Sequence, residues 1–281
     1  WATGSAMNTG RYQLGGAGSQ TAGIAFGGEN SGAAQVANTE QYNGSTWTEV
    51  NDLNLARYLL GGAGETNTSA IAVGGEVDPG GNTADSETWN GSSWTEISNM
   101  NTARRQISVN AANSTNALAF GGGIPSGYTA ATESWNGSAW TEVNDLNDAR
   151  SDTTRTGTYN AGLCVGGDTP GATANTESWN GTSWTEVNNL NTARAFFGGS
   201  STSQTSAVVF GGGPPTTGKT EDWNGVSWVE VADLNTARDN LTGGGTSAAA
   251  LAFGGSQPSK DAGLTEEWSS TSNTDKTIDT D

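Results

Sequence analysis

The sequence predicts an all-β fold built from six similar units, each of four short antiparallel strands, that close into a ring. Glycine pairs recur along the 281-residue chain at steps of 43 to 47 residues, beginning at residues 27, 74, 121, 166, 211 and 254. Arginines repeat with a similar period, at Arg11, Arg57, Arg104, Arg150, Arg194 and Arg238. Repeats of this length without intervening linkers are typical of stacked supersecondary units.

The first two strands of each unit follow its arginine. A glycine-rich stretch such as residues 58–62 is short and lacks helical spacing, so we expect it to form the first strand. The second strand, as in residues 117–120, alternates large apolar residues with a small one, which is typical of a strand buried on both faces. Cys164 occupies the small position, so we interpret it as a core residue rather than a catalytic thiol.

The third and fourth strands form a hairpin. In residues 87–94, Glu-Thr-Trp precedes an Asn-Gly-Ser-Ser turn and Trp94 follows it. Asn-Gly is a strong hairpin signal, because both residues tolerate the positive φ angles of tight turns. The two flanking aromatic residues therefore face each other, which contributes about 0.5 to 1.5 kcal/mol beyond their burial. The same pairing is expected for Tyr42/Trp47, Trp135/Trp140, Trp179/Trp184 and Trp223/Trp228.

The sixth unit is split between the two ends of the chain. Trp268 lacks a following aromatic partner, Trp1 lacks a preceding one, and residues 1–11 match residues 47–57 in register. We therefore expect one domain over residues 1–268, with its last unit completed by the N-terminal strand 1–11. Residues 269–281 are expected to form an outer strand or a tail, and the alternating stretch 276–281 is the rival for the outer position. The repeat is anchored by Trp1, Trp47, Trp94, Trp140, Trp184, Trp228 and Trp268, with the arginines named above.

Two series of glutamates obey the repeat. One series recurs beside the arginines and predicts buried Glu-Arg pairs with a structural role: Glu40, Glu87, Glu133, Glu177, Glu221 and Glu266. The other lies on the fourth strand, where charge discourages edge-to-edge pairing: Glu49, Glu96, Glu142, Glu186 and Glu230.

Composition restricts the classes of function. The chain has 11 basic and 29 acidic residues, a net charge of −18, and this disfavours nucleic acid and anionic membranes as partners. Histidine is absent, which removes the commonest general base and metal ligand, so we expect no metal, no cofactor and no enzymatic activity. The longest apolar run is too short to insert into a membrane. Because the chain begins at Trp1 rather than methionine, we expect a processed product or part of a longer polypeptide.

These repeated features resemble the kelch repeat: a Gly-Gly pair after the second strand, an aromatic in the third, a tryptophan opening the fourth and an arginine before the next unit. The resemblance covers the chain to about residue 268 and implies a six-bladed kelch-type β-propeller with four antiparallel strands per blade. Some sequence motifs are similar to those of kelch-like proteins of marine tailed phages. They are Leu-Asn-Thr-Ala-Arg, Ala-Leu-Ala-Phe-Gly-Gly, Glu-Ser-Trp-Asn-Gly-Ser and the final Lys-Thr-Ile-Asp-Thr-Asp. Those proteins are commonly regarded as virion or tail-fibre components.

Two places break the repeat and are candidate binding sites. The loops between the second and third strands differ in every unit and should emerge on one face, which we call the variable face. From these loops we expect ligand contacts by Asp78, Tyr128, Asp168, Lys219 and Lys260. The alternative explanation for these sequence differences is random drift in surface loops that are under no functional constraint.

The axial channel is the second place, because the first strands should line it. We expect Arg105, Asp152 and Arg155 to place charged side chains in this channel. These residues would either bind a small ligand or have only a structural role as polar residues of the channel lining.

The resulting hypothesis is a non-enzymatic structural or attachment protein, located in a virion or on an extracellular surface. Its partners would be other virion proteins, a host-surface receptor or a glycan. One alternative is a carbohydrate-active enzyme on the same fold, although the histidine ligands of kelch-type copper oxidases and the aspartate boxes of sialidases are missing. Another is a kelch-type adaptor that binds a partner protein.

Overall fold

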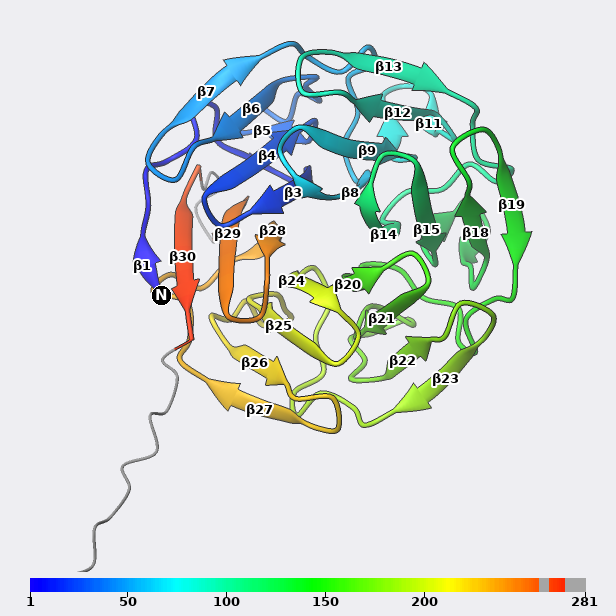
Figure 1. Cartoon of the computed structure of the whole chain (residues 1–281), viewed down its shortest axis with the longest axis vertical. Helices are drawn as coiled ribbons and strands as arrows, with labels where there is room; N and C mark the ends of the chain where they lie inside the picture. Colours follow the sequence, from blue (N-terminus) through cyan, green and yellow to red (C-terminus); the bar gives the residue numbers. More distant parts are fainter. Residues whose placement is uncertain (258–262, 271–281) are drawn as a thin grey trace, which may run out of the picture.

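The computed structural model describes residues 1–257 and 263–270, which form a six-bladed β-propeller (Figure 1). Six four-stranded antiparallel sheets, the blades, are arranged around an axis. The first strand of each blade lies at the centre of the ring and the fourth lies at its circumference. The predicted fold class is therefore confirmed, and no helix occurs in the described part of the chain, so none there could cross a membrane.

Each blade has four strands, named below in order from the axis outward. Blade 1 consists of β3 (Gly15–Ser19), β4 (Ala22–Phe26), β6 (Thr39–Tyr42) and β7 (Trp47–Val50). Blade 2 consists of β8 (Gly61–Thr66), β9 (Ser69–Val73), β12 (Ser86–Trp89) and β13 (Trp94–Ile97). Blade 3 consists of β14 (Ser108–Asn113), β15 (Asn116–Phe120), β18 (Thr132–Trp135) and β19 (Trp140–Val143).

The other three blades repeat this plan. Blade 4 consists of β20 (Thr154–Thr158), β21 (Ala161–Val165), β22 (Thr176–Trp179) and β23 (Trp184–Val187). Blade 5 consists of β24 (Gly198–Ser203), β25 (Ser206–Phe210), β26 (Thr220–Trp223) and β27 (Trp228–Val231). Blade 6 consists of β28 (Asp239–Gly245), β29 (Ala249–Ser256), β30 (Thr265–Ser269) and β1 (Ala2–Thr3).

Three short two-stranded sheets occur in the connections on the variable face. These are β2 (Arg11–Tyr12) with β5 (Glu29–Asn30), β10 (Glu76–Val77) with β11 (Gly81–Asn82), and β16 (Gly123–Ile124) with β17 (Gly127–Tyr128). The pairing of β2 with β5, like the bridge between Tyr58 and Glu76, joins a connection between blades to a loop that follows a second strand. Both kinds of connection therefore emerge on the same face.

The last blade is closed by the N-terminal strand, as predicted. Ala2 pairs with Glu267 and Thr3 with Glu266, and the Trp1 and Trp268 rings lie with their centroids 5.5 Å apart. In Figure 1 the N-terminus lies at the circumference beside β30. Ser269 belongs to β30, whereas the rival stretch 276–281 lies outside the described residues.

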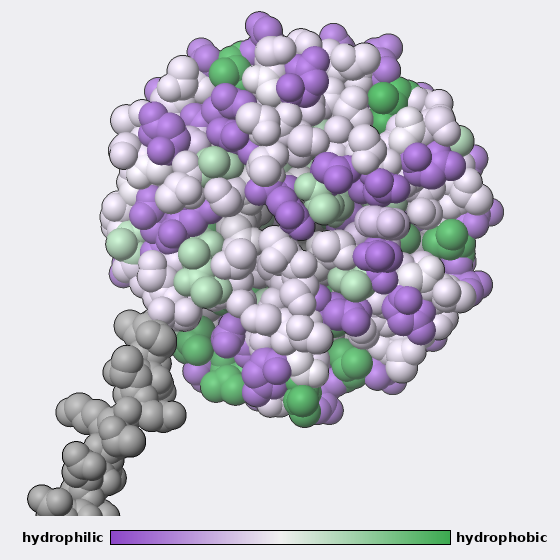
Figure 2. All heavy atoms as spheres, in the orientation of Figure 1, coloured by the Kyte–Doolittle hydropathy of each residue, from purple (hydrophilic) through white to green (hydrophobic). Residues whose placement is uncertain are grey.

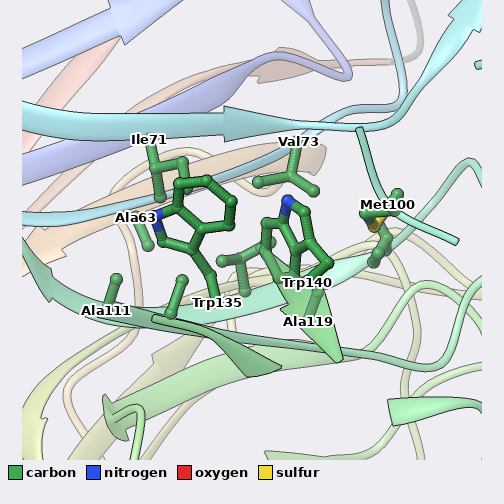
Figure 3. Packing of buried hydrophobic residues seen from close by; sticks show 11 residues of the cluster. Ala63, Ile71, Val73, Met100, Ala111, Ala119, Trp135 and Trp140 are labelled. Atoms are coloured by element: carbon green, nitrogen blue, oxygen red, sulfur yellow. The ribbon is translucent and has the colours of Figure 1, made fainter. Parts of the chain in front are cut away.

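The hydrophobic core lies between neighbouring blades rather than within them. Between blades 2 and 3, Trp135 and Trp140 of one blade pack against Ile71 and Val73 of the other, and Met100 covers one end of the cluster (Figure 3). The tryptophan that opens a fourth strand extends this contact to the preceding blade: the Trp94 ring lies 4.7 Å from that of Phe26, and its Nε1 donates to Thr39 Oγ1 at 3.0 Å. The tryptophans thus hold blades together as well as forming cross-strand pairs.

The predicted Glu-Arg pairs are present in all six blades and are buried. In blade 3, the Arg104 guanidinium lies 2.8 Å from the Glu133 carboxylate, which also accepts hydrogen bonds from the backbone N and Nδ2 of Asn101. Since Arg104 and Asn101 belong to the segment that enters the blade, the carboxylate fastens that segment to the third strand. The Cys164 thiol is buried in the same layer, where Arg150 donates to its sulfur at 3.2 Å.

Candidate functional site

Six residues form a closed ring of backbone hydrogen bonds around the axis, one residue from each blade connection. Each N–H donates to the carbonyl of its neighbour in the preceding blade, at distances from 2.7 to 3.2 Å, and the last bond runs from Gln13 N to Asn240 O. Every member has a φ between 52° and 60°. Such positive φ values are uncommon for residues other than glycine and are retained where the surrounding structure determines them. We call these residues the axial ring: Gln13, Leu59, Gln106, Asp152, Phe196 and Asn240.

This ring explains a difference from the expected start of the first strands. In blade 2 the strand β8 begins at Gly61, not at Tyr58, because Leu59 turns into the left-handed region to join the ring. Each member is the second residue after the repeated arginine, so a constant spacing was present in the sequence. Polarity and the strand pattern did not reveal this spacing, since the six members are of five different residue types.

The axial ring lines a cavity of about 110 Å³ at the centre of the propeller. All six of its residues are partly exposed, and the wall continues through residues of the first strands such as Ser108, Thr154 and Thr242. Asp152 is the charged residue of this lining, so one of the predicted channel residues lies where the sequence pattern placed it.

The order of the ring gives the cavity two kinds of wall. Leu59 and Phe196 are three places apart in the cycle of six, so they stand on opposite sides of the axis. The remaining members form two polar pairs: Gln106 Nε2 donates to Asp152 Oδ2 at 2.7 Å, and Gln13 Nε2 donates to Asn240 Oδ1 at 3.4 Å. The cavity is therefore a slot with two apolar sides and two hydrogen-bonding sides.

Asp152 connects the slot to the variable face. Burial raises the pKa of its carboxyl to about 7, although hydrogen bonds from Ser151 and Gln106 act in the opposite direction, and the nearby Asp168 adds to the rise. Asp168 in turn accepts a hydrogen bond from the Tyr128 hydroxyl at 2.6 Å, and this bond is the main reason that the pKa of Tyr128 is raised to about 12. Two loop residues and one channel residue that were predicted separately thus form one cluster at the mouth of the slot.

A second tyrosine-carboxylate group lies at the junction of blades 2 and 3. Arg105 forms an ion pair with Glu76, and Tyr58 also interacts with Glu76. Burial is the largest cause of the raised pKa of Tyr58, followed by the Glu76 charge. Arg105 was expected in the channel but does not belong to the cavity lining, because its backbone pairs with Gly123 in the loop layer, one residue before the ring.

The other predicted site residues are dispersed. Asp78 is exposed, and its backbone N–H and C=O are both bound by the Gln35 side chain at 2.8 and 3.0 Å. Lys219 turns to the outer strand of blade 5, where its Nζ lies 2.7 Å from Glu230. Arg155 pairs with Cys164 in the sheet register, but its side chain lies outside the described part of the structure, as does the whole of Lys260.

The opposite face of the propeller carries the Asn-Gly turns. In each of them the asparagine Oδ1 accepts backbone N–H bonds from the following residues, as Asn90 does from Ser92 and Ser93 at 2.9 Å. Across the view in Figure 2, hydrophilic and weakly polar residues predominate, and hydrophobic residues form small separate spots. Among the described residues the large exposed hydrophobic side chains are Val226 and Val229 of blade 5.

Comparison of the sequence with protein-family models and with curated proteins finds no match. Within the described residues, no group of three or more histidine, cysteine, aspartate or glutamate side chains is placed to hold a metal ion. The slot and the tyrosine-carboxylate groups at its mouth are therefore the candidate site on geometric grounds.

Proposed function

We propose that this chain is a kelch-type propeller that serves as a non-enzymatic attachment protein, as a component of a phage virion or tail fibre, and that its variable face binds a carbohydrate receptor. The observation that carries the proposal is the difference between the two faces. The Asn-Gly face repeats one turn from blade to blade, whereas the variable face gathers Tyr58, Glu76, Tyr128 and Asp168 near the axis. Recognition usually resides in variable loops on a rigid scaffold.

Carbohydrate is the class of ligand that these groups fit best. Carboxylates accept hydrogen bonds from hydroxyl groups, and aromatic rings offer an apolar face with a polar edge. The net charge of −18 disfavours an anionic receptor, because like charges repel. The virion assignment is supported by the kelch-like arrangement of glycine pairs, tryptophans and arginines. It is also supported by the resemblance of the repeat motifs to those of phage kelch-like proteins.

A matched pair of tyrosine variants tests the binding face. Tyr128 lies on the variable face, and Tyr159 lies in the turn between β20 and β21 on the opposite face. On a glycan array, the wild-type chain should bind a defined set of glycans, Tyr128→Ala should lose that signal, and Tyr159→Ala should keep it. Equal loss in both variants, with native circular dichroism, would argue against the variable face as the receptor site.

The virion assignment is tested separately by mass spectrometry and negative-stain imaging of purified phage particles. Stoichiometric amounts of the chain should remain through density-gradient purification. Its absence from the particles would refute the assignment without deciding whether the chain binds glycans.

A carbohydrate-active enzyme is the second candidate, and Asp152 is the observation that favours it. A carboxyl group with a pKa near 7 beside a cavity has the protonation behaviour of a general acid or base. Turnover can be measured as release of reducing sugar from a polysaccharide panel. Activity that Asp152→Asn abolishes would establish the enzyme, and binding without any turnover would favour attachment.

A further inference from the structure

We propose that the axial slot binds a single uncharged sugar ring, held between Leu59 and Phe196 and hydrogen-bonded by Gln13 and Asp152. The inference rests on the proposed carbohydrate recognition and assigns its principal contact to the axis rather than to the outer loops. It concerns a site whose residues come from four different blades.

The dimensions of the slot fit one ring of a glycan. A water molecule needs on the order of 10 to 15 Å³ of cavity volume, so a cavity of about 110 Å³ admits a ligand of roughly ten non-hydrogen atoms. That is the size of a monosaccharide and is too small for a folded peptide segment. Because the ring residues are partly exposed, a terminal sugar can enter while the rest of its glycan stays outside.

The two apolar walls suit the faces of a sugar. The aliphatic C–H groups of a pyranose lie on its faces, and its hydroxyl groups lie around its edge. Phe196 contributes an aromatic side chain to the lining on one side of the axis, and Leu59 contributes an aliphatic side chain on the other. A ring placed between them leaves its hydroxyl edge directed toward the two polar pairs.

The polar walls present acceptors for those hydroxyl groups. The Gln13 Oε1 is buried without a hydrogen-bond partner among the described residues, and a buried acceptor left in this state costs about 1 to 3 kcal/mol. Asp152 stands on the opposite side of the cycle, where its carboxylate accepts from Gln106 and Ser151 through one oxygen, Oδ2. A ligand with donors at both ends of its edge would satisfy both groups.

The backbone N–H groups of the ring are not free to bind a ligand. All six of them donate to the six C=O groups of the axial ring, so hydrogen-bond donors to a ligand must come from side chains there. The same closed cycle holds the backbone from which these side chains project, which lowers the ordering cost of association. When deprotonated, Asp152 is the charged residue of the described lining, and its charge then disfavours sugar acids.

The test measures binding of sugars to the full chain by saturation-transfer NMR and calorimetry. The neutral sugars are glucose, galactose, mannose and N-acetylglucosamine, and glucuronic acid is the anionic comparison. At pH 8, where Asp152 is mostly deprotonated, at least one neutral sugar should bind and glucuronic acid should not. Phe196→Ala and Gln13→Met should each weaken binding by about tenfold or more, through loss of the aromatic wall and of the acceptor respectively. Val226→Ser, at an exposed position on the opposite face, is the control and should bind like the wild type.

The outcomes separate this inference from the proposed function. If array glycans still bind to Phe196→Ala and Gln13→Met but not to Tyr128→Ala, sugar binding in the slot is refuted and recognition by the variable face stands. Tight binding of glucuronic acid would also refute sugar binding in the slot as proposed. If the wild-type chain binds no carbohydrate at all, both proposals fall. Gln13→Met keeps the length of the side chain, so it remains informative if Phe196→Ala does not fold.

Discussion

Replacing Glu133 with glutamine should destabilise the propeller strongly, although the side chain keeps its shape. The Glu133 carboxylate is fully buried, lies 2.8 Å from the Arg104 guanidinium and accepts from the Asn101 backbone N at 2.7 Å. Arg104 is equally buried and would keep its hydrogen bonds to the Gly121 and Ala131 carbonyls. It would nevertheless lose its counter-ion, because the amide carries no charge.

The magnitude follows from the cost of an uncompensated charge. Breaking a buried ion pair by removing one partner costs about 3 to 5 kcal/mol, whereas an exposed substitution usually changes stability by about 0.5 kcal/mol or less. For a domain of this size, each kcal/mol lowers the melting temperature by about 2 to 4 °C, so Glu133→Gln should lower it by roughly 6 to 20 °C.

Glu142→Gln is the matched control. Glu142 lies directly opposite Glu133 in the β18–β19 register but is exposed, so the same chemical change is made on the neighbouring strand. Urea unfolding followed by tryptophan fluorescence would give both free energies of unfolding. Equal, small effects of the two variants would show that the buried pairs do not hold the connections to the blades.

Two further predictions follow from the axis and from the closure of the ring. The pKa of Asp152 is raised from 3.8 to about 7, so the folded state holds its proton more tightly, and stability falls as pH rises from about 4 to about 7. Asp152→Asn should therefore stabilise the chain at pH 8, by at most about 4 kcal/mol because the site is partly exposed, and leave its stability almost unchanged at pH 4. Thermal melts of both proteins at the two pH values would measure this. A stability difference that is the same at pH 4 and pH 8 would contradict the prediction. Deleting residues 1–3 removes β1 and the Trp1 ring, which contacts Trp268 and Phe210. The deletion should cost about 3 kcal/mol or more and expose Trp268 to acrylamide quenching, and unchanged quenching would contradict closure by this strand.

The blades and the residues that fill them could be predicted from local sequence signals. A period of 43 to 47 residues, the Asn-Gly turns and the paired aromatics are local signals, and each one specifies a strand or a hairpin within a single repeat. The closure by residues 1–11 and the six Glu-Arg pairs could also be predicted, because they follow from comparing repeats with one another. The position of Cys164 in the core was predictable for the same reason.

The position of the candidate site depends on contacts between blades, which local sequence signals do not reveal. Leu59 and Phe196 adopt a positive φ that their own side chains disfavour, because the hydrogen bonds that hold them come from neighbouring blades. Tyr128, Asp168 and Asp152 come from two blades and meet only when the blades pack. Arg105 shows the converse: it was expected in the channel but pairs with Glu76, a loop glutamate that belongs to neither repeating series. A repeat therefore fixes each blade locally, and the closure of six blades around one axis creates the slot.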